Sequence, residues 1–346
     1  LSDETKFVNN IMHSLFSELD VYANGVKIST ANGVYGHKSY LETKMSHAKD
    51  AKDTWLACQG YNYESYPADQ THADIHGREE ATRASEVIKM FGKLSVDFFT
   101  SDKLLLPGVS LRIKLVRAHN DFVVMSDDAG KHYKVTIHEA NLYVRKMAVS
   151  DTVVTSIERV LLKSPAIYKY PEVIPKSFII PRGQNSWRHE DVFMKEPIRR
   201  MAIAMNTNTA FGASNVSNPY HYQKFNQRSI TIYRNGIPIA GTPLETEDNK
   251  RAYFNSLTSL AFGRLSHGIP LNEFENHYIL VFDLTSTLEA SHEFVHPELT
   301  HSSISIEMSF SANVANPIEV FLVGEKSSII FIDSVRNISK NALFGN

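Results

Sequence analysis

The sequence predicts an all-β chain that folds into two tandem barrels of one plan, with a few short helices. Three observations predict this architecture. Most segments alternate between apolar and polar residues with a period of two, turn-forming residues separate these segments, and the order of the segments is repeated along the chain. Many short alternating segments with turns between them are typical of sandwiches and barrels.

The composition narrows the function classes. The chain has 346 residues, and a single core stops growing at about 250–300 residues, so two domains are expected. Lys and Arg number 36 and Asp and Glu 38, for a net charge of −2. Such a chain is poorly suited to neutralise phosphates, so we predict no direct contact with nucleic acid. No apolar run reaches the ~18 residues of a membrane helix, and the sequence leaves open whether the protein lies next to a membrane.

Alternation is clearest in one segment of each half. Residues 111–115 read Leu-Arg-Ile-Lys-Leu, and residues 304–310 read Ile-Ser-Ile-Glu-Met-Ser-Phe. A strand with this pattern has one buried face and one solvent face. Residues 278–282 are instead apolar throughout, which predicts a strand covered on both faces.

Helices are few. Residues 153–161 and 84–91 carry apolar side chains at helical spacing. The later helix is followed by three prolines, Pro165, Pro171 and Pro175. Because proline removes backbone donors and stops a helix, we read this stretch as the connection between two domains, residues 1–163 and 164–346.

The strongest signal is the internal repeat. Residues 21–28 match residues 232–239, and each segment contains an Asn-Gly pair between apolar residues. The pairs are Asn24-Gly25 and Asn235-Gly236. An Asn-Gly pair favours a tight hairpin turn, since both of its residues must adopt positive φ. We therefore predict two equivalent hairpins, with these four residues as structural turn residues.

Further matches follow in the same order. Residues 40–46 correspond to 253–259, 93–99 to 278–284, 109–115 to 302–308, 122–125 to 320–323, and 135–137 to 329–331. Several matches in one order indicate that the chain arose by duplication of one barrel.

The two copies differ before the hairpin. The second copy has two strand-like segments there, residues 176–180 and 201–205, whereas the first hairpin already begins at residue 21. We therefore expect the first barrel to lack its N-terminal strands in this chain, which leaves open sheet edges for further sequence or another chain to cover. The alternative is an N-terminal barrel that is simply smaller.

Several stretches carry a family resemblance. Residues 10–22 read Asn-Ile-Met-His-Ser-Leu-Phe-Ser-Glu-Leu-Asp-Val-Tyr and run into Asn24-Gly25, residues 40–43 read Tyr-Leu-Glu-Thr, residues 104–115 read Leu-Leu-Leu-Pro-Gly-Val-Ser-Leu-Arg-Ile-Lys-Leu, and residues 141–146 read Asn-Leu-Tyr-Val-Arg-Lys. With these residues the chain resembles the major capsid proteins of Polinton (Maverick) elements and adintoviruses. The similarity is strongest at residues 6–47 and 96–147.

The resemblance implies a double jelly-roll fold and a structural role. It implies a homotrimer that forms a pseudo-hexagonal capsomer of an icosahedral shell, with neighbouring capsomers, penton proteins and minor capsid proteins as partners. It also implies a location in the virion after assembly inside the host cell, and neither catalytic residues nor a cofactor. Three copies of a two-barrel chain would present six similar barrels, so one gene could supply a nearly hexagonal tile.

Two other functions fit parts of the sequence. Jelly rolls also serve lectins, so a carbohydrate- or host-recognition protein is an alternative, which predicts aromatic and polar residues in a groove at one loop end. His292, Glu293 and His296 have the H-E-x-x-H spacing of a zinc hydrolase, with His301 as a third candidate ligand. Pro297 disfavours the helix that this motif needs. We therefore expect no metal site and no enzyme activity.

Overall fold

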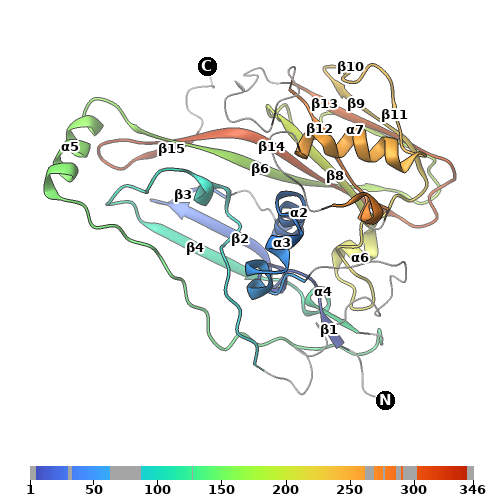
Figure 1. Ribbon diagram of the computed structural model, residues 1–346, viewed down its shortest axis with the longest axis horizontal. Helices are drawn as coiled ribbons and strands as arrows, with labels where there is room; N and C mark the ends of the chain where they lie inside the picture. The colour runs from blue at the N-terminus through green and yellow to red at the C-terminus, as the bar shows by residue number, and fades with distance from the viewer. Residues whose placement is uncertain are drawn as a thin grey trace.

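The computed structural model describes residues 5–29, 33–62, 87–126, 128–261, 269–275, 277–285, 290 and 302–340. These residues form antiparallel sheets and short helices, as the alternation predicts. Figure 1 shows a larger group of strands from the second half of the chain and a smaller group from the first half, with β6 (Ala166–Ile180) and β14 (Ile318–Ile332) reaching over both. No helix among the described residues combines the length and the apolar character that a membrane crossing needs.

In the second half, residues 164–346, the described residues form two sheets of five strands. In one sheet β14 pairs with β6 along one edge and with β8 and β15 along the other, and β12 pairs with β8. The bounds of these three strands are Arg200–Thr207 for β8, Ile279–Asp283 for β12 and Ile338–Lys340 for β15. Neighbouring strands come from distant parts of the chain, as in jelly-roll barrels.

The other sheet has the order β7-β13-β9-β10, with β11 also paired to β9. Its strands are β7 (Ser186–His189), β9 (Gln227–Arg234), β10 (Ile237–Pro238), β11 (Leu244–Glu245) and β13 (Ile304–Phe310). Apolar residues of both sheets belong to one core, among them Ile306, Met308 and Phe321. Burial of this apolar surface stabilises the barrel by about 25 cal/mol per Å².

The uniformly apolar segment 278–282 is covered on both faces, as predicted. Ile279, Leu280 and Val281 of β12 are all buried. The helix α7 (Asn249–Ala261) packs against β12, and Figure 1 shows it lying across the sheet.

In the first half, residues 1–163, the described residues form fewer strands. One sheet has the order β3-β2-β4, with bounds Val26–Lys27, Phe16–Ala23 and Leu111–Arg117. A separate ladder joins β1 (Thr5–Phe7) to β5 (Val124–Ser126). Among the described residues of this half, no strand takes the place that β6, β7 or β8 has in the second half.

The helices are short and follow the repeat. Residues 40–46 and 253–259, which match in sequence, lie in the helices α2 (Tyr35–Ser46) and α7, and each helix follows its hairpin. The helix predicted over 153–161 is confirmed as α5 (Asp151–Leu161). The remaining helices and 3-10 turns are α1 (Ile11–Ser14), α3 (Lys49–Lys52), α4 (Asn120–Val123), α6 (Asn208–Gly212), η1 (Trp55–Gln59), η4 (Asp97–Thr100) and η5 (Leu271–Glu273).

Two strands expected from the repeat do not form in the first half. Residues 97–100 are the 3-10 turn η4, and residues 135–137 have no strand partner. Their counterparts β12 and β14 are held by β8 and β6, which have no equivalents among the described residues of the first half. A strand without a neighbour cannot satisfy its backbone groups in a ladder. The prediction of strands here is wrong, because no described residue of the first half supplies the neighbouring strand.

The helix expected over residues 84–91 is also wrong for its described part. Residues 87–91 are not helical, and Val87 and Phe91 are 70% and 67% exposed. A short amphipathic helix depends on burial of its apolar side chains against the rest of the protein. Val87 and Phe91 are too exposed to provide that burial.

Two of the three prolines after α5 lie in a strand rather than in a connection, while Pro165 directly precedes that strand. Pro171 and Pro175 are part of β6, opposite Ser327 and Val323 of β14. The strand tolerates them because among the described residues β6 pairs only with β14, so the missing N–H groups can face its open edge.

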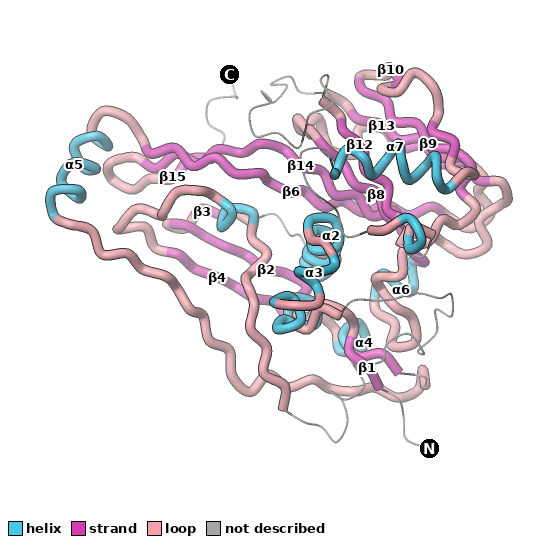
Figure 2. Tube along the Cα trace, in the orientation of Figure 1, coloured by secondary structure: helices cyan, strands magenta, loops and turns pink. Residues whose placement is uncertain are grey.

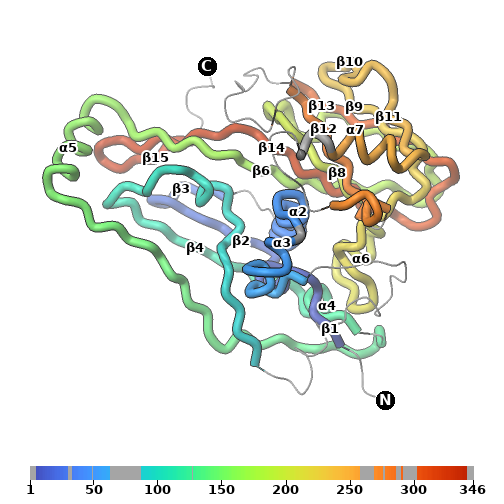
Figure 3. Tube along the Cα trace, viewed as in Figure 1, coloured from blue at the N-terminus to red at the C-terminus, as the bar shows by residue number. Residues whose placement is uncertain are grey.

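The two halves share their apolar cores. Leu19 and Val21 of β2 pack with Tyr168 of β6 and Ile330 of β14. The outer ends of β6 and β14 therefore cover the first half, while their inner ends belong to the second barrel. Figure 3 shows these strands, green and red, running beside the blue β2.

Candidate functional site

Each Asn-Gly turn is hydrogen-bonded to the serine that directly precedes a neighbouring strand. Asn24 and Gly25 have φ of 44° and 85°, the left-handed values that a primed hairpin turn needs. The N–H of Asn24 donates to the carbonyl of Ser110 at 2.9 Å. In return Asn24 Oδ1 accepts from the N–H of Ser110 at 2.7 Å.

The second hairpin has the same arrangement. Asn235 and Gly236 have φ of 50° and 80°. The N–H of Asn235 donates to the carbonyl of Ser303 at 2.9 Å, and Asn235 Oδ1 accepts from the N–H of Ser303 at 2.9 Å. The turn residues are thus structural: they set where the strand before each hairpin meets β4 or β13.

A cluster of buried charges joins the halves. Lys38 of α2 lies 2.6 Å from Asp97 Oδ1 and 3.7 Å from Glu42 Oε1. Asp97 Oδ2 accepts from the N–H of Val173 on β6 at 2.9 Å. Ser95 Oγ donates to Glu42 Oε2 at 2.8 Å. The carboxylate of Asp97 therefore links a helix of the first half to a strand of the second.

The environment shifts the charges of this cluster. Burial raises the pKa of Glu42 to about 7, against the opposing pull of Lys38, and Asp97 raises it further. For Lys38, burial lowers the pKa but Asp97 and Glu42 outweigh it, so the pKa is raised. Lys38 is therefore charged at neutral pH while Glu42 is near its midpoint.

A second ion cluster lies at β8 and β14 of the second half. Arg199 Nε donates to Glu325 Oε1 at 2.8 Å, and Arg200 Nη2 donates to Glu325 Oε2 at 2.5 Å. Burial raises the pKa of Glu325, but the two guanidinium groups hold it below its usual range. Glu325 is therefore ionised at neutral pH, in an ion pair with Arg199 and Arg200.

The two clusters border a cavity of about 580 Å³ between the halves. Its lining includes Glu42, Asp97, Arg200, Glu325 and Trp55. Its size is that of small-molecule sites, but it lies between the two halves and not at a loop end, where the carbohydrate-recognition alternative predicts a groove. Sequence analysis did not single out these residues because the members come from separate segments. The one local signal was Lys38 and Glu42 one helical turn apart.

Aromatic stacking also joins the halves. The rings of His37 and Phe211 stack at 3.9 Å, and those of Tyr40 and Tyr220 at 4.1 Å. The oxygens of Ser14 and Tyr220 lie 2.6 Å apart in a hydrogen bond. Each pair takes one residue from either half, so the halves meet as one packed unit.

Two buried histidines of the first half, His13 and His37, have a structural role. Burial lowers the pKa of His13 and of His37 to about 4. His13 Nδ1 lies 2.7 Å from Tyr35 Oη, and His37 Nε2 lies 3.1 Å from the carbonyl of Phe211. Both rings are therefore neutral at physiological pH and serve packing.

The structure does not describe the zinc candidates of the sequence. His292, Glu293, His296 and His301 are outside the described residues. Within the part of the chain that the structure describes, no group of three or more His, Cys, Asp or Glu is placed to hold a metal ion.

Comparison with known proteins identifies the fold. The sequence matches no protein-family model and no curated protein. The cryo-EM structure of the Sputnik virophage has a TM-score of 0.56 at 10% identity, over 99% of this chain and 77% of that chain. The faustovirus major capsid protein has a TM-score of 0.56 at 9% identity, over 96% of this chain and 74% of that chain.

The PBCV-1 VP54 crystal structure, fitted into a reconstruction of the virophage Sputnik, also has a TM-score of 0.56 at 10% identity, over 99% of this chain and 88% of that chain. At such identities the likeness concerns the fold, and it extends over nearly the whole chain. Together with the repeated hairpins and the two sheets of the second half, it shows that the chain has the all-β, two-barrel fold of double jelly-roll proteins.

Proposed function

We propose that the chain is a structural major capsid protein. The observation that carries the proposal is the double jelly-roll likeness over 99% of the chain to a virophage structure, with a similar likeness to the faustovirus major capsid protein. The absence of enzyme activity is part of the proposal, and the likeness in fold to the faustovirus major capsid protein, a structural protein, supports it.

The finer proposal is a homotrimer that builds a pseudo-hexagonal capsomer of an icosahedral shell, of the Polinton or adintovirus type. The tandem barrels support it, since three copies would place like barrels around one axis. The domains of the proposal are residues 1–163 and 164–346, held in fixed relation by the stacked pairs His37–Phe211 and Tyr40–Tyr220. A capsid subunit whose two barrels keep a fixed relative orientation would suit a closed shell.

Exposed apolar side chains support association with further copies. Val160 and Leu162, at the end of α5, are 60% and 78% exposed. Ile237 at the second hairpin and Phe254 on α7 are 70% and 67% exposed. Contiguous apolar surface is typical of contacts between proteins, and we propose that these side chains belong to such contacts. Neighbouring capsomers, penton proteins and minor capsid proteins are the partners of this proposal, in a virion assembled inside the host cell.

Light scattering on the purified chain, followed by electron microscopy, tests the function. We expect a trimer in solution and three-fold particles with a pseudo-hexagonal outline in micrographs. Val160→Asp together with Leu162→Asp should weaken the trimer, while Lys250→Asp on the exposed start of α7 serves as the matched surface control. A wild-type chain that remains monomeric at high concentration would contradict the proposal.

A further inference from the structure

The cavity of about 580 Å³ between the halves has a floor with two kinds of surface. Part of the floor is an apolar strip on the sheet that contains β14. Val281, Ala202 and Val323 lie opposite one another on β12, β8 and β14, and none of the three is more than 4% exposed. Because residues opposite one another in a ladder point to the same face, these side chains form one continuous apolar surface.

The other part of the floor is ionic. Arg200 and Glu325 lie opposite each other, two positions along β8 and β14 from the apolar strip. Two positions along a strand keep a side chain on the same face and move it by about 7 Å. The cavity therefore holds an apolar strip and a charged end within the length of a small molecule, as a ligand with an apolar body and a charged group requires.

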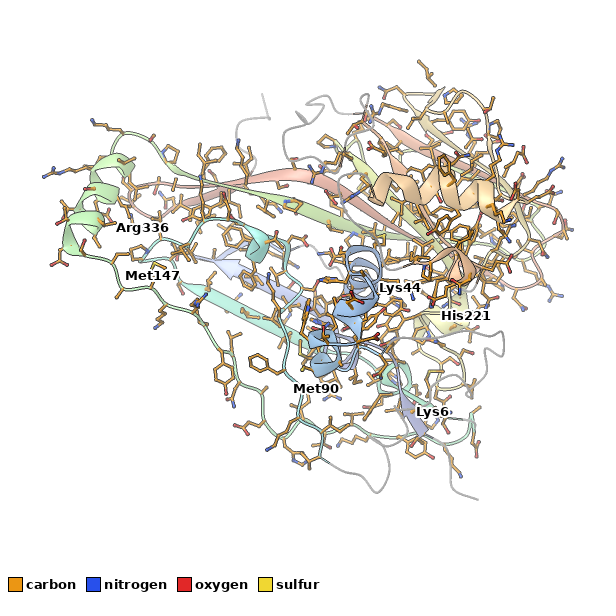
Figure 4. All side chains as sticks on the ribbon, in the orientation of Figure 1. Lys6, Lys44, Met90, Met147, His221 and Arg336 are labelled. Atoms are coloured by element: carbon orange, nitrogen blue, oxygen red, sulfur yellow. The ribbon has the colours of Figure 1, made fainter. Side chains whose placement is uncertain are left out.

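The first half supplies the opposite wall. Met45 of α2, Leu56 of η1 and Leu94 add apolar side chains there. Figure 2 shows α2 beside the long strands β6 and β14, and in Figure 4 the label of Lys44 marks the last turn of this helix. Trp55 also lines the cavity and is 48% exposed, so its indole lies at the opening. A bound molecule would thus contact both halves.

The carboxylates of the cavity are already engaged. Glu42, Asp97 and Glu325 line it. Each accepts hydrogen bonds from neighbouring side chains: Ser95 donates to Glu42, Lys38 to Asp97, and Arg199 and Arg200 to Glu325. Their negative charge is therefore balanced within the protein, which disfavours a cation as the ligand.

Two cationic groups of the cavity have donors to spare. Arg200 Nη1 is buried and has no hydrogen-bond partner among the described residues, and a buried donor without a partner costs free energy. Lys93 lines the cavity at an exposed position, and its ammonium group forms no hydrogen bond or ion pair with another residue of the described part of the chain. A carboxylate would accept charge-assisted hydrogen bonds from such donors. These donors therefore select an anion.

We propose that the cavity binds a small amphipathic carboxylate. The carboxylate accepts from Arg200 Nη1, Lys93 adds positive charge near the opening, and the apolar body of the ligand lies along the strip of Val281, Ala202 and Val323. The volume of the cavity falls in the range of small-molecule sites, about 300–1,000 Å³. The inference goes beyond the proposed shell role and does not depend on it, because it rests on the cavity walls alone.

Other classes of small molecule fit the cavity less well. An uncharged apolar molecule would cover the strip but leave Arg200 Nη1 without an acceptor. A sugar would place hydroxyl groups against the apolar strip, where they find no partner. An amine would lie next to Arg200 and Lys93 and be repelled. Among these classes, the amphipathic carboxylate is the one that satisfies both the strip and the donors.

Tryptophan fluorescence of the purified full chain tests the proposal, with octanoate below its micellar concentration as the probe. The chain has two tryptophans, and Trp55 lines the cavity whereas Trp187 of β7 does not. We expect octanoate to change the emission saturably in wild type and in Trp187→Phe, and to leave it unchanged in Trp55→Phe. No saturable change in wild type, or a change that persists in Trp55→Phe, would overturn the proposal.

A ligand series separates the apolar tail from the charge. Octanol and octylammonium share the chain of octanoate and should bind at least about tenfold more weakly. Acetate lacks the tail and should give no saturable change. Equal binding of octanol and octanoate would mean that the charge is not recognised, and would contradict the choice of ligand.

Two variants locate the carboxylate. Arg200→Gln should weaken octanoate binding by about tenfold or more, through the loss of a charged hydrogen bond. Because Arg200 also pairs with Glu325, Lys93→Gln provides a second test at an exposed position, and it should weaken binding by about threefold to fivefold. Lys89→Gln, at another exposed lysine that does not line the cavity, is the matched control and should leave the affinity unchanged. Equal affinities of wild type, Arg200→Gln and Lys93→Gln would refute the site.

Discussion

Asn24 and Ser110 hold each other by two hydrogen bonds, in which each backbone N–H is donated to an oxygen of the other residue. Asn235 and Ser303 repeat this arrangement in the other half. In each pair the asparagine supplies its side-chain oxygen while the serine contributes backbone groups alone. The duplication of the chain therefore extends to single hydrogen bonds that join each hairpin to its neighbouring strand.

Removing the asparagine side chain should destabilise both halves. We expect Asn24→Ala and Asn235→Ala each to lower the free energy of unfolding by about 1–2 kcal/mol, because each loses the side-chain hydrogen bond to its serine and the residue best able to adopt left-handed φ. Asn24→Ala also loses the bond from Nδ2 to the carbonyl of Arg336, which should place it at the upper end of this range. Ser110→Ala is the matched control and should change it by less than about 0.5 kcal/mol, since its bonds come from the backbone. Urea denaturation measures the differences, and equal losses in Asn24→Ala and Ser110→Ala would contradict this account.

A glycine in the long strand β14 should not tolerate a larger side chain. A Cβ at Gly324 would lie 2.6 Å from Phe193 Cε1 and 3.0 Å from Ile198 Cδ1. We expect Gly324→Ala to cost about 1–3 kcal/mol through overpacking. Gly212→Ala, at the end of α6, has nothing within 4 Å of its Cβ and should be near neutral. Thermal unfolding of both variants checks the contrast; the explanation is wrong if both melt alike.

Local patterns predicted the parts of the fold that depend on local chemistry. Alternation located β4 and β13, and the Asn-Gly pairs located both hairpins, because turn geometry and strand period are written in consecutive residues. The prolines of β6 misled the prediction, since only the pairing with β14 shows that this is an edge strand. Residues 135–137 kept a strand pattern without the partners that a strand needs.

The ion clusters between the two halves could not be predicted from the sequence, for a related reason. Lys38, Asp97 and Val173 lie far apart in sequence, and the fold alone brings them together. A charged residue in a sequence is most often a solvated one, so neither Asp97 nor Glu325 could be recognised as buried. The cavity and its ion clusters are therefore a property of the packing between the halves.

Breaking the ion cluster at Lys38 should be costly. Lys38 is 3% exposed and lies 2.6 Å from Asp97. We expect Lys38→Met to lower the free energy of unfolding by about 3–5 kcal/mol, because it leaves a buried carboxylate without its cation. The double variant Lys38→Met/Asp97→Asn should recover part of that loss, since Asn keeps an acceptor for the N–H of Val173. Denaturant unfolding of the two single variants and the double variant gives the coupling, and strictly additive losses would argue against it.

The pH dependence of stability should depend on Glu42. Its folded-state pKa of about 7 lies above the ordinary value of 4.5, so the folded protein holds this proton more tightly than the unfolded chain does. The resulting stabilisation is full below pH 4.5 and is lost as the pH rises through 7; the difference is about 3 kcal/mol. Glu42→Gln should therefore flatten the decline of the melting temperature between pH 5 and 8, while Glu139→Gln on the exposed segment 131–149 should leave it unchanged. Parallel melting curves for wild type and Glu42→Gln over this pH range would mean that another group governs the decline.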